Sequence, residues 1–225
     1  LKTKKFNYQF GLRAESSNYD GTLLGKDSSF NVQFPISFFP SAFITYRLKE
    51  KQDLQLNYSR KINRPNFFQL MPFVDYTDPQ NLNIGNAGLK PEFANNLEVS
   101  YNTSYKNNSN FLATVFLRYT TDLITRFQYV GKNPLNPADS AVYNTYRNAS
   151  SSTSYGLELT NKTTIAKIWD LTLNVNLFNS KINGTNLDAG LSNERVSWFA
   201  KMNQNFNFLL TSPYNSAAIT RQKRW

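Results

Sequence analysis

The 225-residue sequence contains no cysteine and no histidine. Without cysteine the chain can form neither a disulfide nor a thiolate metal site. The absence of cysteine does not indicate whether the protein works in an oxidising or a reducing compartment. Without histidine it lacks the commonest general base and the commonest metal ligand in proteins. A Ser-His-Asp site cannot be built from these residues. We therefore expect that the chain is not an enzyme and has no catalytic residues, metal site or cofactor.

Long apolar runs are also missing. No stretch of about 18 consecutive apolar residues occurs, so the sequence predicts no transmembrane helix. No signal-peptide pattern opens the chain, because Leu1–Lys5 leads directly into an alternating segment. The first residue is not methionine, and Gln222–Trp225 ends the chain within a strand-like pattern. We interpret the chain as one segment of a larger protein.

Alternation of apolar and polar side chains is the main pattern that is present. In the first such segment, every second residue is apolar from Phe6 to Ala14. A period of two predicts a β-strand with one apolar and one wet face. No helical stripe of comparable length occurs, so we expect an all-β chain. The same alternation recurs over residues 36–48, 54–58, 97–101, 111–119, 155–159, 171–177 and 196–208.

The connections between these segments are of two kinds, and they alternate along the chain. Short turns are expected at Lys49–Asp53, Lys106–Asn110, Ile165–Asp170 and Leu210–Asn215. Long polar connections are expected at Glu15–Pro35, Ile62–Glu92, Val130–Ala141 and Asn183–Glu194. Short turns at one end and long loops at the other are typical of bacterial outer-membrane barrels.

Three further features fit a membrane barrel, and the first two favour it over a soluble β-sandwich, which also alternates and also has aromatics. Residues 142–164 form one predicted strand, longer than the roughly 9–11 residues that a bilayer needs, so its outer part would stand above the membrane. The polar faces are rich in Asn, Thr, Ser and Gln, as a lumen would require. Aromatic residues of the kind found at membrane interfaces occur near strand ends, at Tyr101, Tyr105, Phe127, Tyr129, Trp169, Phe206 and Phe208.

The sequence thus predicts an antiparallel transmembrane β-barrel, here an incomplete set of about ten strands. Residues 1–225 form a single barrel segment without a plug domain. Long loops would be extracellular and short turns periplasmic. In the strand over 171–177, Leu171, Leu173, Val175 and Leu177 should face lipid, and Thr172, Asn174 and Asn176 the lumen. The segments Lys4–Ala14 and Ser216–Arg224 should not pair with each other, which leaves an open, curved sheet.

The long connection from Ser59 to Asn102 carries an ordered series of motif residues. They are Tyr58–Arg60, Asn63–Pro65, Pro72–Phe73, Tyr76, Asp78–Pro79, Asn81, Gly85–Asn86 and Leu89–Glu92. This series resembles a loop of the TonB-dependent receptor-like outer-membrane β-barrels common in Bacteroidetes. Ala87 departs from the proline that the family more often has there. A second patch, Tyr155–Leu159, is similar to a strand common in such receptors.

The resemblance implies a role in import across the outer membrane. This chain would supply wall and extracellular loops of a receptor for an unidentified nutrient. The implied partners are outer-membrane lipid, the rest of the barrel and a plug domain from the parent protein, the TonB complex acting through that plug, and a surface lipoprotein. The alternative is a barrel with a structural, secretion-associated or adhesive role. The net charge of +10 is spread along the chain, so nucleic acid is not an expected partner.

The motif residues have two interpretations. In the first, arginine and aromatic side chains of the loop contact a ligand. In the second, the loop folds back and Phe67, Phe68, Leu70, Met71 and Phe73 pack against one another or the plug. The carboxylates of Asp75 and Asp78 are expected to cap their own turns rather than to catalyse. Candidate residues for ligand binding or loop packing are Arg64, Asn66, Phe68, Tyr76, Asp78 and Asn86.

Overall fold

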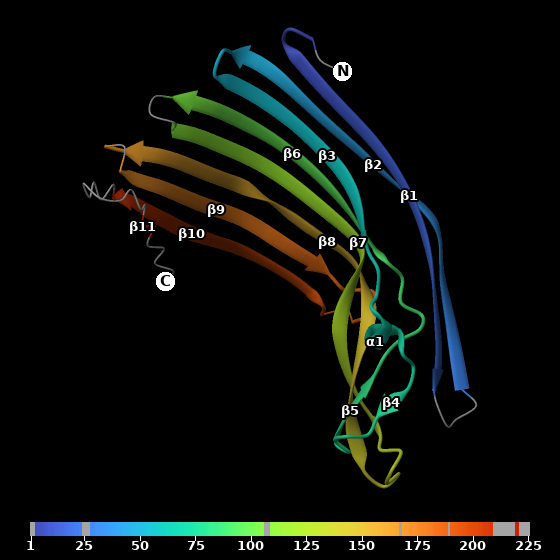
Figure 1. The fold of residues 1–225 in the computed structure, drawn as a ribbon. Coiled ribbons are helices and arrows are strands. Elements are labelled where there is room, and N and C mark those ends of the chain that lie inside the picture. Colours follow the sequence, from blue (N-terminus) through green and yellow to red (C-terminus); the bar gives the residue numbers. More distant parts are fainter. Residues whose placement is uncertain are drawn as a thin grey trace.

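The computed structural model describes residues 3–23, 28–105, 109–166, 168–188, 190–208 and 219–220. These residues form one large sheet of mostly antiparallel strands (Figure 1). The long strands are β1 (Phe6–Leu23), β2 (Ser28–Lys49), β3 (Gln52–Asn63), β6 (Glu92–Tyr105), β7 (Ser109–Lys132), β8 (Ser140–Ile165), β9 (Trp169–Asn183) and β10 (Ser192–Phe208). The short elements are α1 (Phe67–Leu70), β4 (Val74–Asp75), β5 (Asn81–Ile84) and β11 (Ile219–Thr220).

The long strands lie in sequence order, β1-β2-β3-β6-β7-β8-β9-β10-β11, and the sheet is open and curved (Figure 1). Within the described residues, β1 pairs only with β2 and β11 only with β10. No pairing between β1 and β11 is present there, as predicted for the two end segments. Most of Ser216–Arg224 lies outside the described residues. The predicted turn Leu210–Asn215 and part of Lys106–Asn110 lie outside them too.

One face of the sheet carries an unbroken row of large apolar side chains from β1 to β10. Its members are successive cross-strand partners, Tyr8, Ile44, Leu56, Val99, Val115, Leu157, Leu177 and Trp198. Many are exposed, and Trp198 is 73% exposed. Soluble monomers rarely expose so extended an apolar surface, whereas a barrel presents such a band to lipid.

The next row, one residue along each strand, is polar over most of its length. Its members are Asn7, Thr45, Gln55, Ser100, Thr114, Glu158, Asn176 and Phe199. Side chains on this face bond across strands, as between Ser100 and Thr114 (2.9 Å) and between Thr160 and Asn174 (2.9 Å). The alternation predicted from the sequence is therefore confirmed, with Asn174 on the polar face and Leu173 and Leu177 exposed on the other.

The predicted long connection Glu15–Pro35 is wrong over most of its length. β1 and β2 continue through it as a paired hairpin, from Ser17↔Phe34 to Leu23↔Ser28, after a register shift beside Glu15. Phe30, Val32 and Phe34 alternate with polar residues, and their packing on the loop after β3 explains why these polar segments extend as strands. The connection itself, residues 24–27, lies outside the described residues.

The other strand predictions hold. The predicted strand over 142–164 is a single element, β8. The turn between β2 and β3 consists of two residues and lies at the opposite end of the sheet from α1 (Figure 1). The described part of the chain contains no helix of the length and apolarity that would cross a membrane.

Candidate functional site

The long connection between β3 and β6 is folded and contains the short elements α1, β4 and β5. Asn66 caps the one-turn helix α1 by accepting the Gln69 N–H at Oδ1 (2.9 Å). In return, the Gln69 side chain accepts the Asn66 N–H (2.9 Å). This reciprocal pair of hydrogen bonds satisfies two N–H donors at the start of the helix. The bonds stabilise a helix that is too short to be stable on its own.

The second half of the loop returns to the end of α1. Gly85 N–H donates to the Met71 carbonyl (2.9 Å), and Asn86 N–H donates to the Gln69 carbonyl (2.6 Å). A Cβ on Gly85 would lie 2.4 Å from the Met71 carbonyl oxygen, closer than real Cβ contacts come. Glycine is therefore required here because two backbone segments touch at this residue.

A small apolar core holds the loop to the β1–β2 hairpin. Leu70 and Leu89 of the loop are buried against Phe34 of β2. Phe30 of β2 lies 5.7 Å from the Phe67 ring and 6.2 Å from the Phe73 ring, measured between centroids. Phe67, Leu70 and Phe73 of the motif therefore pack on the β1–β2 hairpin, a partner surface that the sequence does not predict.

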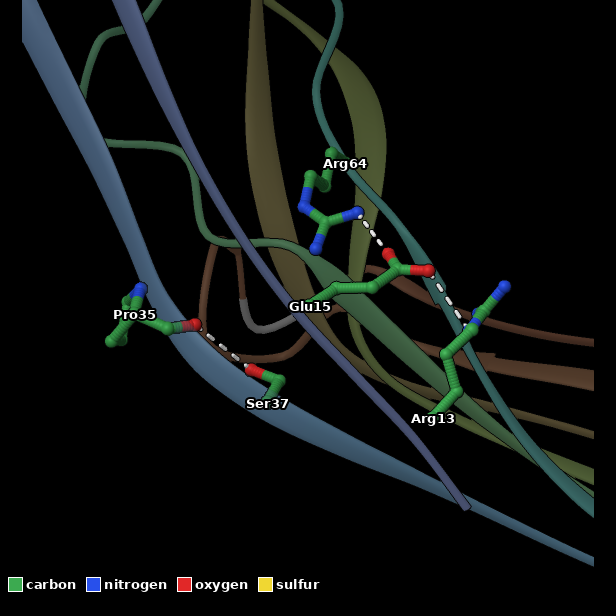
Figure 2. A network of polar contacts seen from close by, with 5 residues as sticks. All are labelled: Arg13, Glu15, Pro35, Ser37 and Arg64. Atoms are coloured by element: carbon green, nitrogen blue, oxygen red, sulfur yellow. Dashed lines mark hydrogen bonds and ion pairs between the residues drawn. The ribbon is translucent and has the colours of Figure 1, made fainter. Parts of the chain in front are cut away.

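An ion pair joins the same two parts of the chain where the sheet divides. β2 pairs with β3 as far as Ser41↔Ser59 and then continues without a β3 partner. Beyond this point, Arg64 Nη1 lies 2.8 Å from Glu15 Oε2, and Arg13 Nε lies 2.8 Å from Glu15 Oε1 (Figure 2). Arg64 Nε and Nη2 are buried without a hydrogen-bond partner among the described residues.

The two loop aspartates shape turns, as predicted. Asp75 accepts hydrogen bonds from the hydroxyl and from the N–H of Thr77, and these bonds hold the pKa of Asp75 below its ordinary value of 3.8. Asp78 accepts from the Asn81 side chain (2.9 Å) and from the Gln80 N–H (2.9 Å), which likewise lowers the pKa of Asp78. Each carboxylate is thus an acceptor for its own turn.

The loop also crosses the β7–β8 hairpin and binds the far edge of β8. β5 pairs in parallel with residues 142–144 of β8. Asn86 Nδ2 donates to the Tyr146 carbonyl (3.0 Å). Asn148 accepts the Lys90 N–H (2.9 Å) and donates to the Lys90 carbonyl (3.0 Å). These bonds fix the loop against a strand that is distant in the sequence.

An open cleft of about 770 Å³ lies between the loop and this hairpin. The loop lines it with aromatic and apolar side chains and with the Asp75 carboxylate, and the hairpin adds a guanidinium and amides. Phe68 lines this cleft and is 75% exposed, although its ring meets the Phe67 ring edge-on at 5.9 Å, as part of the expected packing among the loop aromatics. The hairpin residues that line the cleft are Arg126, Phe127, Gln128, Asn144, Thr145 and Tyr146.

The six predicted candidates do not converge on one site. Phe68 alone of the six lines the cleft, and Tyr76 is exposed elsewhere on the loop. The other four, Arg64, Asn66, Asp78 and Asn86, make the structural bonds described above. The sequence reasoning missed the hairpin side of the cleft, because Arg126 and Tyr146 lie in an ordinary strand pattern that has no motif.

Comparison with known proteins agrees with this architecture. Residues 1–223 match the model of the outer membrane protein beta-barrel family. No curated protein matches the sequence.

Three solved structures share the fold at low sequence identity. The siderophore receptor PirA from Pseudomonas aeruginosa aligns with a TM-score of 0.57 and 16% identity, over 88% of this chain and 43% of that one. The ferric enterobactin receptor PfeA in complex with BCV-L6 gives 0.56 and 14%, over 91% and 36%. The Serratia marcescens hemophore receptor HasR, a double mutant in complex with HasA and heme, gives 0.56 and 13%, over 92% and 44%. The chain spans less than half the length of each.

Proposed function

Since the chain belongs to the outer membrane protein beta-barrel family, we propose that it forms wall and outer loops of a receptor that imports a nutrient across the outer membrane. The observation that carries this proposal is the folded loop between β3 and β6, which sits at the long-loop end of a lipid-facing sheet. Bacterial barrels place that end outside the cell. A ligand arriving from outside would meet this loop first.

The similar structures add support of a limited kind. Each is a receptor, for a siderophore, for ferric enterobactin or for a hemophore. At 13–16% identity they support the fold of this chain, and its substrate stays unidentified. In the proposed assembly, the rest of the barrel and a plug come from the parent protein, and the TonB complex acts through that plug. A surface lipoprotein is a further proposed partner at the outer loops.

Within the loop we assign two groups of residues. Phe68 and Tyr76 are exposed and would be available to contact a ligand. Arg64, Asn66, Asp78 and Asn86 keep the loop folded by the bonds that they make. Substituting the first group should change ligand affinity with the barrel intact, and substituting the second should loosen the loop.

The test is made in cells that produce the parent protein. Formaldehyde crosslinking should join the parent protein to TonB, and the yield should rise when the transported nutrient is present. The sequence that precedes residue 1 in the parent protein should encode a plug with a TonB box. A parent protein with no plug and no TonB crosslink would contradict import and favour a structural, secretion-associated or adhesive barrel.

A further inference from the structure

In the outer half of the β7–β8 hairpin, the free edge of β8 has hydrogen-bond partners and the free edge of β7 does not, among the described residues. β7 pairs with β6 only as far as Phe93↔Thr121, whereas its pairing with β8 continues to Lys132↔Ser140. From about residue 123 onward, the edge of β7 that faces the β6 side therefore has no neighbouring strand among the described residues. The far edge of β8 has several partners over the same height.

Loop residues bond to the edge of β8 at several positions between Val142 and Ser150. The Gln80 carbonyl accepts the Val142 N–H (2.8 Å), and β5 pairs with the residues that follow. The Asn86 side chain reaches the Tyr146 carbonyl. Asn186 Nδ2 donates to the Asn148 carbonyl (2.9 Å), and its Oδ1 accepts the Ser150 N–H (2.9 Å).

These bonds identify which groups of β7 point the other way. In an antiparallel pair, directly opposed residues turn their N–H and C=O groups either toward each other or both outward. Val142, Asn144 and Tyr146 are opposed to Val130, Gln128 and Arg126. The outward groups of these three β7 residues must therefore point to the bare side.

Ile124, two residues before this stretch, supports the assignment. Its N–H points to the same side and donates to Glu92 Oε1 of β6 (2.6 Å). Beyond it, no backbone partner on this side is present in the described part of the chain. The Arg126 carbonyl has one contact of 3.5 Å, from the Thr125 hydroxyl, which is at the limit for a hydrogen bond.

Apart from the charge of Arg126, the local sequence has none of the usual features that protect an exposed edge. Exposed edge strands are usually blunted by lysine, proline or a bulge. Residues 124–130 contain neither lysine nor proline, and their register with β8 is regular. Val130 is 71% exposed. Arg126, exposed at the cleft, has no ion-pair partner among the described residues.

The two faces beside the edge differ in chemistry. On one face, the Tyr129 ring stacks on Tyr143 at 5.0 Å and lies 6.5 Å from Phe127, so this face is mainly aromatic, with the Arg147 guanidinium 4.2 Å from the Phe127 ring centroid. Arg126 and Gln128 occupy the alternate positions, so their side chains leave the strand on the opposite face. An added strand with apolar side chains on one face and acidic ones on the other would match both surfaces.

We propose that the β7 edge at Arg126–Val130 binds an extended peptide segment of an extracellular partner protein, which adds a strand to the β7–β8 hairpin. The segment would alternate apolar and acidic side chains, with an acidic one opposite Arg126. Backbone bonds to the edge supply affinity, and the two faces supply selectivity. The edge borders the cleft that Phe68 lines, but binding of a peptide there requires no passage through the barrel.

The experiment uses the full-length parent receptor and fluorescent peptides of alternating glutamate and valine. A lysine–valine peptide of equal length and a backbone N-methylated glutamate–valine peptide are the comparisons. We expect the glutamate peptide to bind at least about tenfold more tightly than either, because each comparison lacks a charge contact or a backbone hydrogen bond. Arg126→Glu should reverse the order of the two charged peptides. Lys51→Glu, at the opposite end of the sheet, should leave that order unchanged.

Two results would overturn the proposal. One is equal binding of the glutamate, lysine and N-methylated peptides. This comparison uses only the wild-type receptor, so a folding defect of a variant cannot explain its result. The other is protection of Val130→Cys from a membrane-impermeant maleimide in intact cells without any added peptide. That protection would indicate that another loop of the parent protein already occupies the edge.

Discussion

Arg64 and Glu15 form the ion pair that joins the loop after β3 to the first hairpin, with Nη1 2.8 Å from Oε2 (Figure 2). It lies just beyond the point where the β2–β3 ladder ends. Backbone hydrogen bonds join β2 to β3 nearer the turn between them, and beyond the end of that ladder this side-chain contact holds the two parts of the chain together. The Arg64 side chain is only 17% exposed, so the contact is partly shielded from solvent.

Loss of this ion pair should loosen the outer half of the β1–β2 hairpin. We expect Arg64→Met to speed chymotrypsin cleavage there, since the variant keeps the apolar stem and removes the bond to Glu15. Arg13→Met is the matched control, because Arg13 contacts the other oxygen of Glu15 and is more exposed. Equal cleavage rates in the two variants would show that Arg64 does not hold the hairpin.

Replacement of Gly85 by alanine should unfold the loop without unfolding the barrel. The added Cβ would collide with backbone atoms of Met71 and Gln69, which cannot move aside as a side chain can. Overpacking of this kind costs about 1–3 kcal/mol. The measurement is the rate of proteolysis within residues 64–91 of the receptor in lipid vesicles. Gly88→Ala, whose Cβ would meet only the Asn86 side chain at 3.1 Å, should cost less.

The loop should loosen in acid. Hydrogen bonds from Asn81 and Gln80 lower the pKa of Asp78 in the folded loop, so its stabilising effect is complete above the ordinary value of 3.8. That effect is lost as the pH falls through the lowered pKa of the folded state. Cleavage of the loop by an acid protease should therefore rise steeply with falling pH in the wild-type protein. Asp78→Asn should show a shallower pH dependence, and an unchanged dependence would contradict the assignment.

The two faces of β9 should differ in their tolerance of charge. Arginine in place of Val175 should cost about 2–4 kcal/mol in folding free energy if the residue lies near the bilayer midplane. Arginine in place of Asn174 should be mild, because that face carries polar side chains such as Thr160. Folding titrations in lipid vesicles measure both. The reverse ranking would mean that the polar face is the one in lipid.

The strands could be predicted from the sequence because period-two alternation directly reflects a sheet with two different surfaces. The interior of the loop could not. Helix α1 spans four residues, too few for any period, and it depends on the reciprocal capping bonds between Asn66 and Gln69. The parallel pairing of β5 with β8 joins segments about 60 residues apart, and no local pattern encodes it.

The sequence predicts a loop at Glu15–Pro35 because the polar residues there outweigh the alternation of Phe30, Val32 and Phe34. That alternation is explained only when the partner surface on the loop is known. The role of Phe68 could not be predicted for a similar reason. Phe67, next to it in the sequence, packs on Phe30, whereas Phe68 points to an open cleft.

The most direct test of the account is the orientation of the sheet, measured by cysteine labelling in intact cells. This segment has no cysteine of its own, so a single introduced thiol adds the only label within it. Asp188→Cys lies in the connection between β9 and β10, and Lys51→Cys lies in the turn between β2 and β3. We predict that a membrane-impermeant maleimide labels only the first variant until the outer membrane is permeabilised. Equal labelling of both, or labelling of Lys51→Cys alone, would contradict an outer-membrane barrel with its long loops outside.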